Sequence, residues 1–189
     1  NDAPTDGEGT QTHREDDIPA FPQDYPILPV RRRFWEQTLR VLDRTGTDSQ
    51  LRNQLSMVHK AIQTHLDAPL GTVIPADYLY FDAADKLLQH RLLPRKVHEN
   101  TMTWRNGSET DQLMARACGL VFLINKLAGF NSEIGIRATA ETVADLMVED
   151  LPAGGGALRN ALPELLDGCE LLMKVGSEYR IQTEESAAW

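Results

Sequence analysis

The chain has 189 residues, of which 41% are hydrophobic, and it carries a formal net charge of −9 at neutral pH. This length and apolar content suit one compact domain or two small ones. No apolar run reaches the roughly 20 residues that a membrane-spanning helix needs, and the acidic balance argues against a general nucleic-acid binder. We therefore expect a cytoplasmic protein that has no membrane partner.

The acidity is concentrated at the two ends of the chain. Residues 24–104 hold eleven Lys and Arg against nine Asp and Glu, whereas residues 139–189 hold three against ten. The first residue is Asn1, and no apolar signal-peptide core follows it. We expect the sequence to be a piece of a longer protein, in which residues 1–23 form an acidic, proline-rich linker or arm.

The first regular structure is expected after a series of prolines at positions 19, 22, 26 and 29. Because proline lacks a backbone donor and restricts the residue before it, residues 18–29 are predicted to be extended rather than helical. Pro29 also suits the first turn of a helix, which the apolar spacing extends to about Arg44. Thr45 and Gly46 then provide a typical helix stop.

A second helix is predicted to start after Asp48 or Ser49, either of which can cap it. Its apolar residues recur at helical spacing along one stripe: Leu51, Leu55, Val58, Ile62 and Leu66. The connection to the preceding helix is short, so the two should pack as an antiparallel pair.

The helical pattern breaks at Pro69 and Gly71. A short helix over about 83–90 and another from Pro94 to about Trp104 are predicted next. The polar stretch RNGSET follows, and its composition is typical of a turn. We place a boundary there, between a helical subdomain at 24–104 and a second domain at 105–189.

The second domain is predicted to contain three helices and a hairpin. A broad apolar face indicates a buried helix over 112–127, and Thr139 caps a helix over about 140–149. A helix over about 157–168 follows, with Pro163 as a candidate bend. The runs LLMKV and EYRIQ, joined by Gly176-Ser177, predict a hairpin with a type II′ turn. The predicted fold class is mainly α with a small β-hairpin, and this order is that of a winged helix-turn-helix domain.

The glycines of AGGGALRN, residues 153–160, raise the alternative of a phosphate-binding loop. A Walker-type loop needs a Lys followed by Ser or Thr at the helix start, but Ala157, Leu158 and Arg159 stand there. A dinucleotide-binding loop follows a strand, whereas a helix is predicted here. The sequence therefore favours a turn between two helices.

Basic residues that can contact phosphate or nucleic acid fall in two places. In a winged helix the third helix and the wing approach DNA, and here they offer Arg159, Lys174 and Arg180. Glu164 and Asp167 share that surface, which favours protein docking over DNA reading. The other candidates are the consecutive Arg31, Arg32 and Arg33, for which the alternative is a solvated first helical turn.

No complete active site is evident in the sequence. The five histidines lack metal-ligand spacing, and no serine or cysteine lies in a nucleophile motif, so we assign no catalytic residue and no metal ligand. Cys118 and Cys169 lie in apolar helical patterns, which are typical of small core residues in a reduced protein.

Three segments of the chain are especially characteristic: YPILP, LDRTGTDSQLR and LMKVGSEYRIQTEESAAW. With them, nearly the whole chain, residues 24–189, resembles the region after the nucleotide-binding core of the large P-loop ATPases of BREX phage-defence systems, the BrxC/PglY family. Such proteins are similar to AAA+ ATPases in which a helical lid and then a winged helix follow the ATPase core. The resemblance implies a lid-like subdomain followed by a winged helix here.

The resemblance also implies a role in antiviral defence. In that plan a lid arginine senses the nucleotide, and the matching positions are Arg52 and, as the competitor, Arg44. ATP and Mg²⁺ would belong to the parent protein, and this fragment would hold no cofactor and catalyse no reaction. We expect it to couple nucleotide state to other BREX proteins or to self-association, with at most weak DNA binding. The alternative is a free-standing winged-helix transcriptional regulator.

Overall fold

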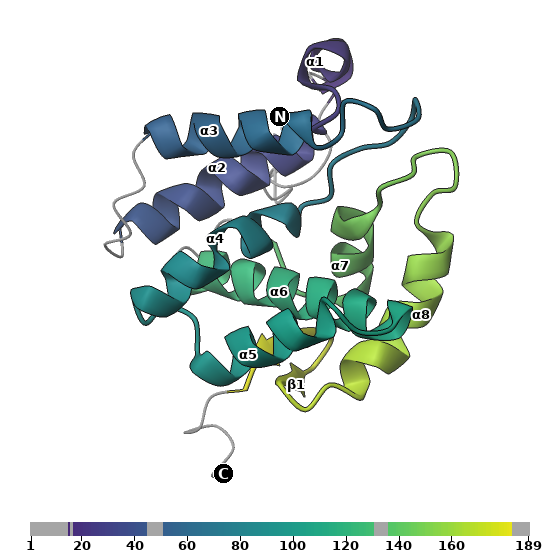
Figure 1. Cartoon of the computed structure of the whole chain (residues 1–189). Helices are drawn as coiled ribbons and strands as arrows, with labels where there is room; N and C mark the ends of the chain where they lie inside the picture. Colours follow the sequence, from purple (N-terminus) through teal and green to yellow (C-terminus); the bar gives the residue numbers. More distant parts are fainter. Residues whose placement is uncertain (1–14, 16, 45–50, 131–135, 183–189) are drawn as a thin grey trace, which may run out of the picture.

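The computed structural model describes residue 15 and residues 17–44, 51–130 and 136–182 (Figure 1). This part of the chain is mainly helical with one small antiparallel sheet, as the sequence predicted. The elements in chain order are α1 (Asp17–Asp24), α2 (Pro29–Arg44), α3 (Leu51–Gln63), α4 (Tyr78–Gln89), α5 (Arg95–Trp104), α6 (Glu109–Phe130), α7 (Ala140–Met147), α8 (Gly156–Asp167), β1 (Leu172–Val175) and β2 (Glu178–Ile181).

Helix α6 lies in the middle of the molecule and is contacted by α2, α4, α5, α7, α8 and β2 (Figure 1). Its apolar side chains from Ala115 to Leu127 are almost all buried. The helix begins three residues before the predicted start because Ser108 and Asp111 form reciprocal hydrogen bonds across its first turn, with N–O distances of 2.9 and 3.2 Å. This pairing satisfies backbone donors that an uncapped helix would leave open.

Helix α1 contradicts the prediction that residues 18–29 are extended. Pro19 is the third residue of α1, where a missing N–H costs no helical hydrogen bond, and Pro22 lies further inside. The helix packs against α2, and Asp17 forms an ion pair with Arg33. Tertiary contacts therefore outweigh the proline penalty, and they are invisible to a local reading of the sequence.

The next helices follow the sequence closely. Helix α2 spans the predicted residues, and α5 begins after Pro94 as expected. Helix α3 ends at Gln63, so Leu66 lies outside it and is 61% exposed, contrary to the predicted stripe. The proposed caps at positions 48 and 49 lie outside the described residues, and the antiparallel packing of α2 and α3 stays a prediction. Helix α4 begins at Tyr78, five residues before the predicted start.

One helix cap and two turns in the second half of the chain agree with their sequence signals. The Thr139 hydroxyl accepts a hydrogen bond from the Thr142 N–H and caps α7. The glycine-rich stretch joins α7 to α8, as expected of a turn, and Gly154 has a φ of +69°. Gly176 has a φ of +65°, which the first central position of a type II′ turn requires.

The hairpin β1–β2 is antiparallel, with Leu172 opposite Ile181 and Val175 opposite Glu178. Its second strand is fixed to α6 by the Asn125 side chain, whose amide donates to the Tyr179 carbonyl at 3.1 Å. The Asn125 oxygen accepts from the Ile181 N–H at 2.9 Å. The hairpin is therefore anchored to the central helix by backbone recognition as well as by apolar packing.

One cluster of buried hydrophobic side chains extends from Ile27 to Tyr179 and includes members from both predicted domains. Cys118 and Cys169 belong to it as free, buried thiols, which confirms their reading as core residues. The polar turn at 105–108 is present between α5 and α6, while the division into two domains there stays a prediction.

Gly119 on α6 provides a test of this packing. A Cβ atom there would lie 2.4 Å from the Tyr80 ring, which is fully buried. We expect Gly119→Ala to lower the free energy of unfolding by about 1–3 kcal/mol, because overpacking outweighs the gain in helix propensity. The matched control is Gly156→Ala, where a Cβ would meet open space. Urea unfolding should show a lower free energy of unfolding for Gly119→Ala but not for Gly156→Ala. Equal stability of the two variants would contradict the close packing of Gly119 against Tyr80.

Candidate functional site

The C-terminal end of α7 is the place where the two halves of the chain are joined. The last carbonyl groups of a helix have no partner within it and must find donors elsewhere. Here the Arg31 guanidinium donates to the carbonyl of Asp145 at 3.2 Å and to that of Val148 at 2.6 Å. Arg116 donates to the Met147 carbonyl at 3.0 Å. We call Arg31 and Arg116 at these carbonyls the arginine cap.

Arg31 is the more deeply buried member of the arginine cap, with 1% of its surface exposed. Its third hydrogen bond goes to the Ile74 carbonyl at 2.7 Å. Burial lowers the pKa of Arg31 to about 10, so the side chain remains charged at neutral pH. The negative end of the α7 dipole and three carbonyl oxygens solvate this charge in place of water.

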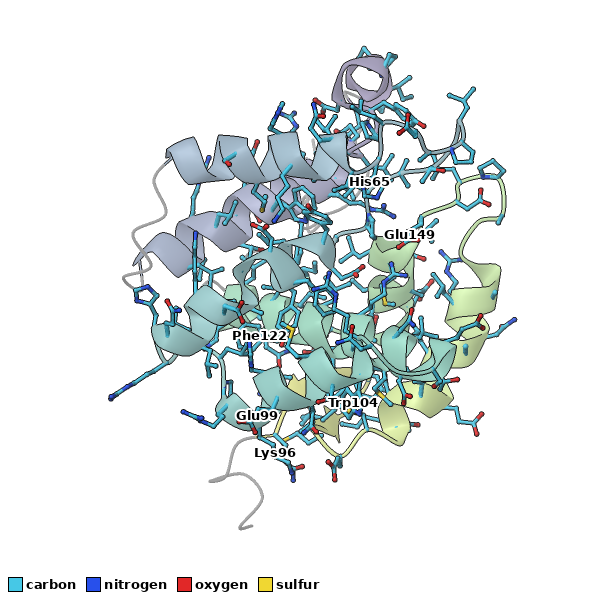
Figure 2. The ribbon with its side chains drawn as sticks, viewed as in Figure 1. His65, Lys96, Glu99, Trp104, Phe122 and Glu149 are labelled. Atoms are coloured by element: carbon cyan, nitrogen blue, oxygen red, sulfur yellow. The ribbon has the colours of Figure 1, made fainter. Side chains whose placement is uncertain are left out.

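Arg116, on α6, connects the arginine cap to two carboxylates. Its Nε donates to Asp77, directly before α4, at 2.9 Å, and its Nη2 pairs with Glu149 at 2.8 Å. Burial works against the charged form, but the nearby charges of Asp77 and Glu149 raise the pKa of Arg116. Figure 2 shows Glu149 beyond the end of α7 that faces the N-terminal helices.

The residues 72–77, which we call the crossing segment, run between α2 and the end of α7. On one side the Ala76 N–H donates to the Leu146 carbonyl at 2.9 Å, and the Val73 N–H to that of Glu149 at 2.7 Å. On the other side the Ile74 N–H donates to the Pro26 carbonyl at 2.9 Å, and the Trp35 indole to that of Ala76 at 2.9 Å. The crossing segment therefore ties the start of α2 to α7 through its backbone.

The three adjacent arginines have different environments. Arg31, expected at the surface as a phosphate contact, is buried in the arginine cap, because the end of α7 supplies acceptors that water would otherwise provide. The side chain of Arg32 is 48% exposed and pairs with Asp24 at 3.1 Å. Arg33 forms a two-bond ion pair with Asp17, one bond of 2.9 Å. Arg32 is the exposed member of the triplet.

The basic residues expected on the third helix and the wing are largely engaged with neighbouring acids. Arg159 pairs with Asp145 at 2.7 Å. Lys174 pairs with Asp167 at 2.8 Å, and this contact lowers the pKa of Asp167. Arg180 is exposed and makes no ion pair within the described residues. The positive charge available to an external phosphate is therefore small on this surface.

Arg44 and Arg52 are the nucleotide-sensing candidates from the sequence. Arg44 is the last residue of α2 and Arg52 the second of α3, and the side chains of both lie outside the described part of the chain. Their assignment as nucleotide-sensing candidates stays a prediction that depends on the resemblance.

Sequence reasoning missed two features of the interior. It did not identify the arginine cap. The available signal was the helix predicted over about 140–149, which has a cap at its start, Thr139, but no defined end. It also treated Cys118 and Cys169 as separate, whereas the two buried thiols influence each other. The neighbouring Cys169 thiol and burial raise the pKa of Cys118, while the Cys118 thiol lowers the pKa of Cys169.

Within the described residues, no three side chains of metal-ligating type come together, and no helix is both long and apolar enough to cross a membrane. Comparison with known protein families, with characterised proteins and with solved structures finds no match to the chain.

The arginine cap predicts unequal roles for neighbouring arginines. We expect Arg31→Met to lower the free energy of unfolding by about 2–4 kcal/mol, because two buried carbonyl groups and a partly buried one lose their donor. The control is Arg32→Met, whose side chain is half exposed and forms ion pairs that contribute less than about 1 kcal/mol. Guanidinium chloride unfolding of both variants measures the difference, and a similar loss in each would argue against a special role for the arginine cap.

Proposed function

We propose that the chain is the non-catalytic lid and winged-helix region of a larger BREX-type ATPase in phage defence, where it couples nucleotide state to protein contacts. The observation that carries the proposal is the arginine cap together with the crossing segment. They join the predicted lid-like helices to the predicted winged helix by buried hydrogen bonds. A region that transmits a change of position between two parts needs such a connection.

The order and contacts of α6, α7, α8 and the hairpin support a winged helix. Helix α7 contacts both α6 and α8, and α8 contacts β1. The Tyr179 N–H on β2 donates to the Ala138 carbonyl at 2.8 Å, so the residue just before the cap of α7 lies beside the hairpin. Three helices with a strand-like segment and a wing are the parts that this domain type requires.

The charges support protein docking rather than DNA reading. The bases of α8 and β1 are paired with Asp145 and Asp167, and residues 139–189 hold ten acids against three bases. A DNA-binding surface needs several cations that replace condensed counterions. The partners proposed are other defence proteins or further copies of the chain, in the cytoplasm, with ATP and Mg²⁺ held by the parent protein.

The charge pairing leads to a prediction about DNA. The chain should bind duplex DNA no more tightly than about 10⁻⁴ to 10⁻⁶ M at physiological salt, the non-specific range. The double variant Asp145→Asn, Asp167→Asn releases Arg159 and Lys174 and should bind more tightly. Glu164→Gln together with Glu170→Gln removes the same number of charges without releasing either base, and it serves as the control. Fluorescence anisotropy measures all three. Submicromolar binding by the unmodified chain would favour the transcriptional regulator instead.

The parent protein provides the test of the proposed function. We expect the reading frame that contains this chain to encode a P-loop upstream of it. Arg52→Ala in that protein should lower ATP hydrolysis and phage restriction, because a guanidinium is suited to binding the terminal phosphate. Arg40→Ala, an exposed position on α2, is the matched control. A reading frame without a P-loop, or full hydrolysis and restriction by the Arg52 variant, would refute this role.

A further inference from the structure

Several large apolar side chains are exposed on two loops that lie next to each other. Leu70 is 92% exposed and Leu66 61% exposed in the connection between α3 and α4, while Leu151 is 37% exposed after α7. Pro69 and Pro152 are exposed beside them. We call Leu66, Pro69, Leu70, Leu151 and Pro152 the paired-loop patch. Isolated exposed leucines are common in proteins, but several on adjoining loops are typical of a contact site.

Backbone contacts fix the two loops against each other. Thr72 and Asp150 form an antiparallel bridge, and the Leu151 N–H donates to the Gly71 carbonyl at 3.1 Å. Gly71 has a φ of +97°, and a Cβ there would lie 2.9 Å from the Pro152 ring. Leu70 and Pro152 are therefore held close together. The arrangement exists before any partner binds, which lowers the entropy cost of association.

The charged side chains of the two loops that carry the paired-loop patch are acidic. Residues 61–76 and 138–158 contain five acids, Asp67, Glu141, Asp145, Glu149 and Asp150, and no Lys or Arg. Arg159 and Arg116 pair with Asp145 and Glu149, but Asp67 and Asp150 flank the apolar residues directly in sequence. The His65 ring, next to Leu66 in sequence, bonds to the Ala61 carbonyl at 2.8 Å.

We propose that the paired-loop patch docks a partner protein through a segment that combines apolar side chains with Lys or Arg. The apolar side chains of the segment cover Leu70 and Leu151, and its cations face Asp67 and Asp150. This proposal goes beyond the proposed function, because the loops lie at the opposite end of the molecule from the hairpin (Figure 1) and require no nucleotide.

The same charges argue against two other occupants of the paired-loop patch, a second copy of the chain and an anionic membrane. A second copy would bring an identical acidic rim to the contact, and like charges across an interface are unfavourable. An anionic membrane surface attracts basic segments, and the two loops offer none. A basic, apolar segment of another protein satisfies both the exposed leucines and the acids.

The test uses the whole chain labelled with ¹⁵N and two synthetic peptides. One peptide forms an amphipathic helix of leucine, alanine and lysine, and the other replaces each lysine with glutamate. The lysine peptide should shift amide signals of residues 64–73 and 149–154, while the glutamate peptide should not. Leu70→Ser should weaken lysine-peptide binding about tenfold, as expected for the loss of a central apolar contact. Val175→Ser, an exposed apolar residue of the hairpin, is the control and should leave it unchanged.

Several results would overturn the proposal. These are shifts confined to other parts of the chain, equal binding of the two peptides, and binding that Leu70→Ser leaves intact. Shifts at the paired-loop patch that depend on protein concentration without peptide would assign it to self-association. Sedimentation with anionic lipid vesicles that Leu70→Ser abolishes would assign it to a membrane. Because Leu70 is exposed, a change in the circular dichroism spectrum is not expected in the variant.

Discussion

The structure depends on how the C-terminal carbonyl groups of α7 are satisfied. Four consecutive carbonyls, from Asp145 to Val148, receive donors from Arg31, Ala76 and Arg116. These donors come from α2, from the crossing segment and from α6, so a single helix end organises three distant parts of the chain. A short helix of this kind gains little stability by itself, and two guanidinium groups at its negative end supply what its sequence lacks.

This use of arginine inside the protein explains the character of its surface. Arg31 and Arg116 serve buried acceptors, and Arg159 and Lys174 are paired with Asp145 and Asp167. Little positive charge therefore remains for an external phosphate on α8 or the hairpin. Asp145 contacts two arginines: its carbonyl accepts from Arg31, and its carboxylate accepts from Arg159. The surface is acidic because these cations are either buried or already paired with acids.

The same contacts support a coupling role for the region. A movement of α2 relative to α7 must break hydrogen bonds of Arg31 and of the crossing segment, among them the buried bonds of Arg31 to the Ile74 and Val148 carbonyls. Displacement therefore costs more than it would across a wet interface, and the two halves should move together. The two loops of the paired-loop patch adjoin these contacts. Thr72 belongs to the crossing segment, and Asp150 follows Glu149, which pairs with Arg116. A partner docked there would contact the part of the molecule that connects its halves.

The sequence by itself determined the local elements. Helix periodicity and end signals located α2, α5, α6, α7 and α8, and the Gly176-Ser177 turn located the hairpin, because these features depend on residues close together in the chain. It failed for α1, where packing against α2 overrides the prolines. It also failed for the arginine triplet, because adjacent helical residues point about 100° apart and their partners are distant in sequence. The acceptors of Arg31 include the carbonyl of Val148, which is distant in sequence. Only the tertiary structure therefore decided that Arg31 is buried while Arg32 faces solvent.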